Sequence, residues 1–214
     1  MNPRLRSKIA LTGIFKMNFQ TASKYPTPCD RIEVSSDFFR SAEFQTRGYF
    51  IFRLYAAIGR HPFYAEFMPD LAKVSGFLTD AQLEANKMAF IQEFMSRSEF
   101  QTMYGGLTDP TAYVNALLNT VGLPNHPTKE AWIAALTNQT MTRAQVLRAL
   151  IESSEVLQKY YNEAFVVMQY FGYLRRDPDA LYMQWIDALN KTGDYRMLIN
   201  GFLNSSEYPK RFGP

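Results

Sequence analysis

The longest nearly unbroken run of hydrophobic positions spans residues 165–174 and ends in a basic pair, Arg175 and Arg176. A helix with apolar side chains on almost every side must be covered all round, so this run predicts a central helix. The basic pair falls in its last turn, where cations suit the negative end of the helix dipole. Asp177 and Pro178 come next and predict a helix start, with Asp177 as the N-cap and Pro178 as the first helical residue.

The same order of features occurs twice more. Residues 49–60 form another apolar stretch, which ends at Arg60 before His61 and Pro62, and residues 112–123 form a weaker copy that ends before Pro124. Each stretch precedes a segment of helical spacing with one large aromatic residue: Phe67, Trp132 and Trp185. Each of the three units then closes on a serine-rich, acidic segment, which contains Glu99, Glu155 or Glu207, and an extra copy of this segment with Glu43 lies at residues 38–44. The four glutamates recur at intervals of 56, 56 and 52 residues.

Repeated helical segments stack on their neighbours to bury a shared core. The sequence therefore predicts an all-α fold in which repeated helical units of about 55 residues pack into one compact domain. Helix-start signals agree with this prediction. Thr79 with Gln82 and Thr142 with Gln145 have the spacing of a capping box. No long segment alternates between apolar and polar residues as strands do, so we expect no sheet.

The chain divides into an arm and a body. We expect residues 1–28 to form an N-terminal arm and linker, and residues 29–214 to form the repeat domain, with units at about 29–48 (partial), 49–104, 109–160 and 161–214. Residues 1–20 fit an amphipathic helix, either docked on the body or lying on a membrane surface. The apolar part of this arm is short and no small-residue cleavage site follows it, so a cleavable signal peptide is not expected. No segment has the roughly 20 apolar residues that a membrane-spanning helix needs.

Four blocks of the sequence carry a family resemblance: IEVSSDFFRSAEFQTRGYFIFRLY, NKMAFIQEFMSRSEFQTMY, AFVVMQYFGYLRRDPD and SSEYPKRFGP. They resemble the DUF4214 family, and most closely a version frequent in acidobacterial proteins, over about residues 30–214. The resemblance implies an all-helical module of bacterial surface and secreted proteins, related in fold to phycobilisome linker domains, with no established activity. That version has a fuller first unit with a second cysteine. Residues 1–28 show neither, so we expect a shortened relative or the C-terminal part of a larger protein.

Composition excludes some classes of function. The net charge of +3, from 23 basic and 20 acidic residues, is too small for the electrostatic footprint of a nucleic-acid-binding protein. The single cysteine, Cys29, excludes an intramolecular disulfide, so packing must hold the fold. The 17 Phe and 13 Tyr residues are suited to filling the interfaces between units.

Few residues are candidates for chemistry. Cys29, His61 and His126 are the only soft metal ligands, and a zinc site needs three or four converging ligands. A nucleophilic Cys–His pair is no better supported, because the neighbours of Cys29 would not lower the pKa of its thiol. We therefore expect no metal site, no cofactor and no catalytic residue.

Arg176, Asp177 and Asp179 form the densest charged cluster. The cluster fits an anion or calcium contact, or alternatively a helix cap combined with an ion pair. Calcium needs about six oxygen ligands, so the second interpretation is favoured. We predict that Arg60 and Arg176 each pair with a closing glutamate such as Glu99 or Glu207. Exposed tryptophans stack on sugars, but Trp132 and Trp185 lie at helical spacing beside aliphatic residues, which favours a core position.

The candidate site is thus a structural repeat signature rather than an active centre: Glu43, Arg60, Glu99, Trp132, Glu155, Arg176, Asp177, Asp179, Trp185 and Glu207. We expect a non-catalytic scaffold or linker, or protein–protein interaction module, of a bacterial surface or secreted assembly, with another protein or a second copy as its partner. The alternative is a cell-envelope polysaccharide-binding module, which would need exposed aromatic residues near Asn, Asp or Arg in a groove between units. An enzyme would need a polar cluster in a cleft, and the sequence places no such groups together. The resemblance implies an extracellular or cell-surface location.

Overall fold

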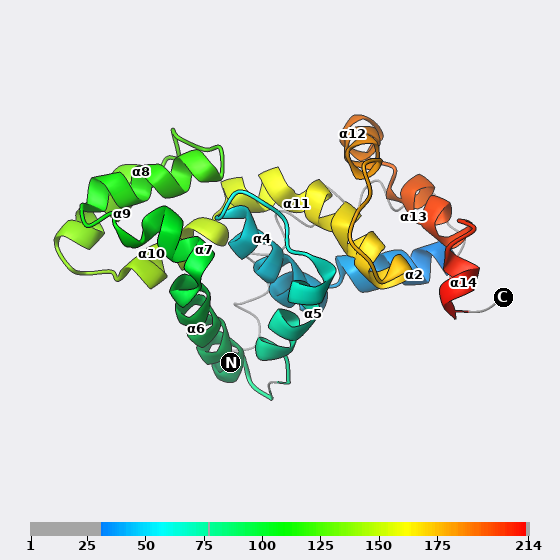
Figure 1. Ribbon diagram of the computed structural model, residues 1–214, viewed down its shortest axis with the longest axis horizontal. Coiled ribbons are helices and arrows are strands. Elements are labelled where there is room, and N and C mark those ends of the chain that lie inside the picture. Colours follow the sequence, from blue (N-terminus) through cyan, green and yellow to red (C-terminus); the bar gives the residue numbers. More distant parts are fainter. Residues whose placement is uncertain (1–30, 77, 213–214) are drawn as a thin grey trace, which may run out of the picture.

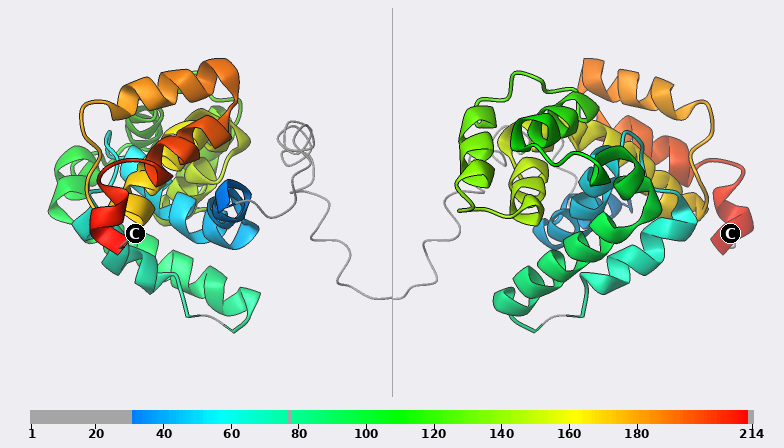
Figure 2. Two further views of the ribbon diagram at one scale, coloured as in Figure 1. Left: turned by 90° about the vertical axis from the view of Figure 1, so that its right-hand side faces the viewer. Right: turned by 60° about the vertical axis from the view of Figure 1, so that its left-hand side comes forward.

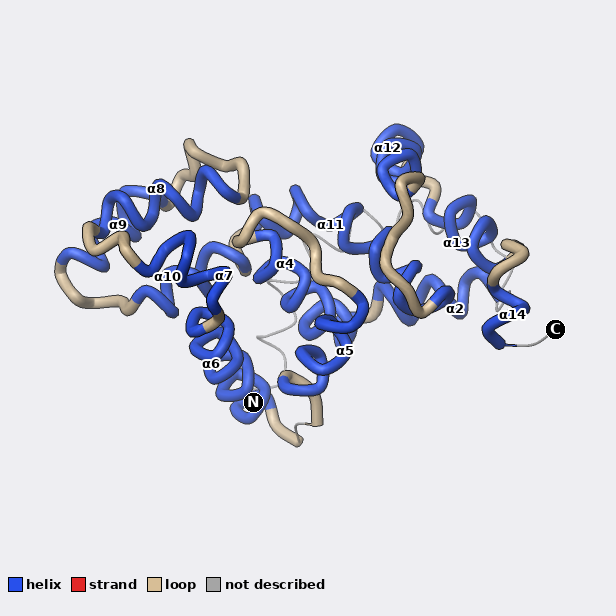
Figure 3. Tube along the Cα trace, viewed as in Figure 1, coloured by secondary structure: helices blue, strands red, loops and turns tan. Residues whose placement is uncertain are grey.

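The computed structural model describes residues 31–76 and 78–212, and these residues form helices and connecting loops without any strand (Figure 3). The all-α prediction is confirmed for this part of the chain. The arm at residues 1–28 and Cys29 lie outside the described residues. Each helix in the described part is too short or too polar to cross a lipid bilayer.

The helices follow one another with short connections, and three π-helical segments (η) interrupt them. The elements are α2 (Arg31–Arg40), α3 (Ala42–Phe44), η2 (Gln45–Tyr49), α4 (Phe50–Ala56), α5 (Tyr64–Lys73), α6 (Asp80–Ser96), α7 (Ser98–Phe100), η3 (Gln101–Gly105), α8 (Pro110–Thr120), α9 (Lys129–Thr137), α10 (Arg143–Ile151), α11 (Ser154–Gln169), η4 (Tyr170–Leu174), α12 (Tyr182–Thr192), α13 (Tyr195–Leu203) and α14 (Tyr208–Phe212).

The apolar run at residues 165–174 forms the end of α11 and all of η4, and it lies at the centre of the fold as predicted. Val166 and Val167 are completely buried, and so is Gln169, whose side-chain amide donates to the backbone carbonyl of Phe165 at 3.1 Å. In Figure 1, α11 runs across the middle of the molecule, with α8, α9 and α10 at one end and α2, α12, α13 and α14 at the other. The buried helix α4 lies beside α11 and completes the centre of the core.

Local signals place the helix starts correctly. Thr79 and Thr142 form reciprocal capping boxes with Gln82 and Gln145, as the spacing predicts. Such boxes satisfy backbone donors that the first turn of a helix would otherwise leave unpaired. These starts fix where α6 and α10 begin.

The predicted helix start at Asp177 and Pro178 is wrong. Helix α12 begins only at Tyr182, and the Asp177 carboxylate instead accepts a hydrogen bond at 2.6 Å from the backbone N–H of Tyr64, the first residue of α5. The chain turns sharply before this point, because Arg175 takes a left-handed conformation with φ of 49°. Asp177 therefore caps a helix more than 100 residues away in the sequence.

Two of the serine-rich closures have the same local structure. The three-residue helices α3 and α7 are each followed directly by a π-helical segment, η2 and η3, which begin with the same Gln-Thr pair. The third closure instead begins the long helix α11, and the fourth precedes the short α14. The first two closures are therefore equivalent in structure, while the repetition of whole units stays a prediction.

Segments from the two ends of the described chain pack together. The views in Figures 1 and 2 both place α2 next to α13. Arg196 forms an ion pair with Glu33, and the Tyr195 hydroxyl donates to the same carboxylate at 3.2 Å. The rings of Phe39 and Tyr173 lie 5.6 Å apart and join α2 to η4. This packing closes one end of the fold and forms the walls of a pocket.

Candidate functional site

Arg60 lies at the turn after α4 and holds the closing glutamate of α7. Its guanidinium lies 2.7 and 2.8 Å from the two carboxylate oxygens of Glu99, and 2.8 and 2.9 Å from those of Glu66. The hydrogen bond to Glu99, followed by that to Glu66, raises the pKa of Arg60 above its usual value despite burial. The guanidinium also lies 4.8 Å from the ring centre of Tyr55. The predicted pairing of Arg60 with Glu99 is therefore present.

Arg176 makes the second predicted pair. Its Nε and Nη2 atoms lie 2.9 and 3.0 Å from the carboxylate oxygens of Glu207, and Nη2 also lies 3.0 Å from Asp179. The remaining bonds of Asp179 come from the Tyr170 hydroxyl and the backbone N–H of Leu181, both at 3.0 Å. Both carboxylate oxygens of Asp179 thus bind protein donors. The predicted ion pair of Arg176 is therefore present, whereas no side chain of this cluster caps α12, because Asp177 caps α5 instead.

His126 occupies the corresponding turn between α8 and α9, and the sequence interpretation missed its partner. The histidine Nε2 lies 3.2 Å from the Glu155 carboxylate, although the two groups are not aligned for a hydrogen bond. Its Nδ1 accepts a hydrogen bond at 3.1 Å from the backbone N–H of Thr128, which places the proton of the neutral ring on Nε2, facing Glu155. The imidazole stacks on the Trp132 indole with ring centres 4.6 Å apart.

The signal that could have identified His126 was its position. Arg60, His126 and Arg176 each follow an apolar helix and lie within two residues of a proline. In each case a cationic or protonatable side chain faces the glutamate of the next closure, and its ring or guanidinium packs on an aromatic residue. We call these three contacts the turn–closure pairs.

The remaining signature residues do not join a common centre. Glu43 pairs with Arg47 within its own segment. Trp132 is buried, with 6% of its surface exposed, so the predicted core position is confirmed. Trp185 is partly buried and packs on Phe202 with ring centres 6.0 Å apart. The signature therefore marks separate helix junctions, which it holds in place.

Two further charged networks join helices and were not predicted. The buried Asp70 accepts from the Tyr55 hydroxyl at 2.7 Å and from Arg97 at 2.7 and 2.8 Å. Burial alone would raise the pKa of Asp70, but the hydrogen bonds from Arg97 and Tyr55 outweigh it and hold this pKa below its usual value. Lys87 of α6, also buried, lies 2.8 Å from Glu152 after α10.

No metal-binding cluster occurs in the part of the chain that the structure describes: no three His, Cys, Asp or Glu side chains come together there in a suitable arrangement. The ring of His61 packs against Tyr182, with centres 5.4 Å apart, and against Phe63 at 6.4 Å. Burial lowers the pKa of this histidine, so the imidazole is neutral at physiological pH. His61 therefore contributes an aromatic contact between the turn before α5 and the start of α12.

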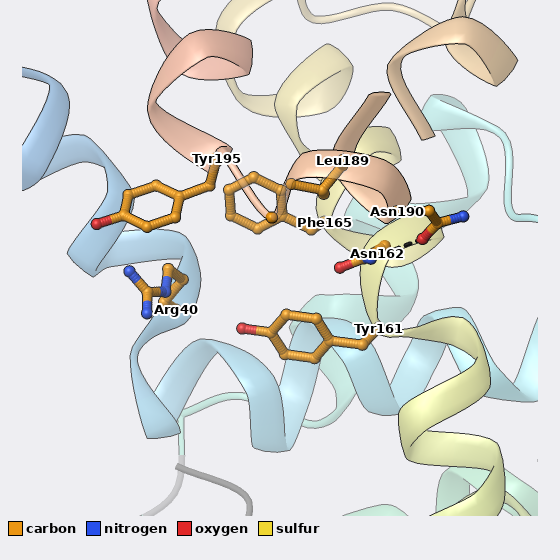
Figure 4. A pocket seen from close by; sticks show the side chains of 8 residues that line it. Arg40, Tyr161, Asn162, Phe165, Leu189, Asn190 and Tyr195 are labelled. Carbon is orange, nitrogen blue, oxygen red and sulfur yellow. Dashed lines mark hydrogen bonds between the residues drawn. The ribbon is translucent and has the colours of Figure 1, made fainter. Parts of the chain in front are cut away.

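A pocket of about 200 Å³ lies between α2, α11, α12 and the start of α13 (Figure 4). Eight residues line it: Arg40, Tyr161, Asn162, Phe165, Leu189, Asn190, Gly193 and Tyr195. Among them, Asn190 and Gly193 are exposed, whereas Phe165 and Leu189 are buried. Sequence reasoning missed this pocket because its walls come from segments about 120 residues apart.

The polar groups of the pocket are fixed by contacts with one another. Asn162 donates to the side-chain carbonyl of Asn190 at 2.7 Å, and the Arg40 guanidinium lies 4.3 Å from the ring centre of Tyr195. Burial is the largest cause that raises the pKa of Tyr195, so this phenol stays protonated at neutral pH. The pocket lining contains one cation, two phenols and two amides, and no carboxylate, histidine or thiol. Such a lining can bind a polar ligand but holds no pair of groups for acid–base chemistry.

Comparison of the sequence with known protein families finds one match, over part of the chain. Residues 91–160 match the family described as "Domain of unknown function (DUF4214)". The matched region runs from within α6 to within α11 and contains the turn–closure pair of His126 and Glu155. No curated protein and no solved structure gives a significant match to the chain. Residues 91–160 are therefore similar to the DUF4214 family, within the region where the sequence resembles it.

Proposed function

We propose that the protein is a non-catalytic scaffold or linker module that binds another protein, in a bacterial surface or secreted assembly. The observation that carries this proposal is an exposed apolar surface where the turn before α5 meets α12. Phe63, Leu181 and Met183 are about half exposed there, at 48%, 54% and 52%. The contact between His61 and Tyr182 holds the two segments together. We call these three exposed residues the α5–α12 surface.

The chemistry around this surface supports binding rather than catalysis. Arg60, Glu99, Arg176 and Glu207 lie on the adjoining segments and are engaged in the turn–closure pairs. Exposed apolar side chains bordered by charged groups are typical of protein interaction sites. The turn–closure pairs keep the helices beneath the surface in fixed positions. Less conformational entropy is therefore lost when a partner binds.

The test is capture of a partner by tagged protein from extracts of the host cell, followed by titration with the purified partner. The double variant Leu181→Ser, Met183→Ser should weaken that binding at least tenfold, since two apolar contacts are lost. Leu78→Ser is a matched control, because Leu78 is 90% exposed but lies before α6, outside the α5–α12 surface. Equal binding by the double variant and the wild type would contradict the proposal.

A second candidate function is binding of cell-envelope polysaccharide, and the pocket favours it. Such a module needs aromatic residues near Asn, Asp or Arg in a groove, and the pocket brings Tyr161 and Tyr195 together with Asn162 and Arg40. The sequence directed attention to Trp132 and Trp185 for this role, whereas the pocket directs it to the two tyrosines. Capture of a polysaccharide fraction by the wild type, and its loss in Tyr161→Ala without unfolding, would support this function. Unchanged capture by that variant would place binding elsewhere.

A further inference from the structure

We propose that the turn–closure pair of His126 and Glu155 is a proton-dependent switch at the junction of α8, α9 and α11. The other two turn–closure pairs contain Arg60 and Arg176, and a guanidinium group in a protein stays charged. Histidine is the side chain whose ordinary change of charge falls between about pH 5 and 8. The junction at His126 is therefore the one of the three whose contacts can respond to acid. This inference is independent of the proposed binding functions.

The turn after α8 is built around the neutral form of His126. Its side chain is 1% exposed, so the ring nitrogens depend on contacts within the protein rather than on bulk water. Nδ1 accepts a hydrogen bond at 3.1 Å from the backbone N–H of Thr128, which leaves the ring proton on Nε2. Nε2 lies 3.2 Å from the Glu155 carboxylate but makes no hydrogen bond to a described residue. The turn thus satisfies one nitrogen of the ring and leaves the other beside an anion.

A second proton on the ring changes both contacts. It must bind Nδ1, because this nitrogen carries the free lone pair of the neutral ring. Nδ1 then becomes a donor, so it can no longer accept from the backbone N–H of Thr128, and the turn at residues 126–128 has to rearrange. The imidazolium at the same time gains a charge-assisted contact with Glu155, which is stronger than a neutral one. Protonation therefore replaces a contact within the turn by a contact between the turn and α11.

Glu155 is prepared to receive the imidazolium. The hydrogen bond from its own backbone N–H, followed by that from the Ser154 hydroxyl, lowers the pKa of this carboxyl, so it is ionised throughout the range in which histidines titrate. The Ser154 hydroxyl donates at 3.0 Å to Oε2, the same oxygen that lies 3.2 Å from His126. The carboxylate that faces the ring is therefore charged and held in place.

The elements that surround the ring carry further titratable groups, from the start of α9, the end of α10 and the first turns of α11: Lys129, Glu130, Arg148, Glu152, Lys159 and Tyr160. Arg148 and Glu152 pair with each other at 3.0 Å. The Lys159 ammonium donates to the backbone carbonyl of Gly122 at 2.9 Å. Lys129 and Glu130 are adjacent and of opposite charge, so their effects on the ring largely offset each other. The charge that acts on the ring at short range is thus that of Glu155.

The Trp132 indole connects the switch to α9. It stacks on the His126 ring with centres 4.6 Å apart and is 6% exposed, so a shift of the ring toward Glu155 also changes the surroundings of the indole. Trp132 belongs to α9 and Glu155 to α11. The proton on His126 therefore affects how α9 packs against the rest of the domain.

The test follows both histidines of the full-length chain by NMR, since the sequence contains two. The ring nitrogens of His126 and His61 and the backbone amide of Thr128 are recorded from about pH 8 to about pH 4. At the upper end, the nitrogen shifts of His126 should identify the neutral ring with its proton on Nε2. As the pH falls, the Nδ1 shift and the Thr128 amide shift should change together, with a single midpoint. In Glu155→Gln this midpoint should move to lower pH, because the imidazolium loses its counter-charge.

Three controls distinguish this switch from general effects of acid. Glu130→Gln removes a carboxylate that is exposed and is not paired with the ring, so it should move the midpoint of His126 less than Glu155→Gln does. The midpoint of His61 should be the same in these proteins, because that ring lies at the turn before α5. His126→Arg gives this junction the permanent charge of the other two, so the Thr128 amide should no longer follow the pH.

A measurement on the wild type tests the pair even if Glu155→Gln fails to fold, as judged by circular dichroism. The Glu155 side chain is 36% exposed, so salt at about 1 M should screen its charge. The midpoint of His126 should then move to lower pH, as it does in Glu155→Gln.

Four results would overturn the proposal. A ring proton on Nδ1 at the upper end of the pH range would mean that Thr128 does not donate to this ring. A Thr128 amide that stays constant while the ring titrates would show that the turn does not respond to the proton. A midpoint that moves equally in Glu155→Gln and Glu130→Gln would remove the role of the pair. A His126 ring that stays neutral until acid unfolds the protein would show that the pair is purely structural.

Discussion

The Arg97 guanidinium donates two hydrogen bonds to the Asp70 carboxylate, at 2.7 and 2.8 Å, and so connects the end of α6 to α5. Asp70 is 3% exposed and also accepts from Tyr55 of α4. We expect Asp70→Asn to lower the free energy of unfolding by about 2–3 kcal/mol, because the charged hydrogen bonds from Arg97 are weakened inside the fold. Urea denaturation at pH 7 measures the change.

Asp187→Asn is the matched control for that experiment. Asp187 is exposed in the middle of α12, so the same chemical change should alter the free energy of unfolding by less than about 0.5 kcal/mol. If Asp70→Asn lowers the free energy of unfolding no more than Asp187→Asn does, the network around Asp70 does not stabilise the fold.

The same network predicts a dependence of stability on pH. The pKa of Asp70 is lowered in the folded protein, because its hydrogen bonds to Arg97 and Tyr55 outweigh the opposing effect of burial. A lowered pKa means that the folded state binds a proton less readily than the unfolded state. The resulting stabilisation is complete above the ordinary pKa of 3.8 and is lost as the pH falls through the lower, folded pKa.

We therefore expect the free energy of unfolding to decrease as the pH falls below about 4, and to decrease less in Asp70→Asn than in the wild type. Urea denaturation at a series of pH values from 7 to about 2.5 checks this, since the series extends from above to below the ordinary pKa of 3.8. A pH dependence that is identical in the two proteins would assign the acid sensitivity to other carboxylates, among which Glu152, beside Lys87, also has a lowered pKa.

The turn–closure pair of Arg176 and Glu207 is partly exposed, with 29% and 32% of the two side chains accessible. Water screens such a pair, so we expect a coupling energy of about 0.5–1 kcal/mol from a double-mutant cycle with Arg176→Ala and Glu207→Ala. The coupling should decrease in 1 M salt, where the screening length is about 3 Å. A coupling of zero at low salt would mean that the pair orients the turn without stabilising it.

Sequence reasoning succeeded where the partners are close in the chain. The capping boxes at Thr79 and Thr142 join residues three positions apart, and their geometry follows from the backbone of a helix start. It also found the pairing of Arg60 with Glu99, because the repeat placed a basic residue and a glutamate at matching positions in each unit. The prediction for Asp177 failed for the opposite reason. A local pattern placed Asp177 at the start of the next helix, whereas its carboxylate caps α5, which is distant in the sequence.

The pocket and the Asp70 network could not be predicted, because no local pattern marks them. Arg40 and Tyr195 read as an ordinary basic residue and an ordinary aromatic residue, and only the packing of α2 on α13 brings them together. Asp70 lies beside Pro69 within α5 and reads as a solvent-facing acid, although the neighbouring helix buries it. Such features depend on tertiary contacts, which composition and periodicity do not encode residue by residue.

The two tryptophans should differ in their access to solvent. Trp132 is 6% exposed and is covered by the His126 ring, whereas Trp185 is only partly buried against Phe202. Iodide is charged and does not enter the core, so it should quench the fluorescence of Trp185→Phe, which retains Trp132, less than that of Trp132→Phe. Stern–Volmer titrations of the folded variants measure this. Strong quenching of Trp132 would contradict its assignment to the core.

Gly172 in η4 lies against the ring of Phe39 from α2. A Cβ atom there would lie 3.0 Å from Cε1 of Phe39 and closer still to its Cζ atom. Phe39 cannot move away at low cost, because it is 5% exposed and packs on the rings of Phe44 and Tyr173, with centres 5.4 and 5.6 Å away. We expect Gly172→Ala to lower the free energy of unfolding by about 1–3 kcal/mol, as overpacked cores do.

Gly106 provides the opposite case at the end of η3. Its backbone is right-handed, with φ of −79°, and a Cβ atom there would meet nothing within 4 Å. Gly106→Ala restricts the unfolded chain without a clash, so it should raise the free energy of unfolding by about 0.4–1 kcal/mol. Urea denaturation of both variants tests the pair. If Gly172→Ala and Gly106→Ala changed the free energy of unfolding equally and in the same direction, backbone entropy would dominate at both sites. The contact between Phe39 and Gly172 would then not be tight in solution.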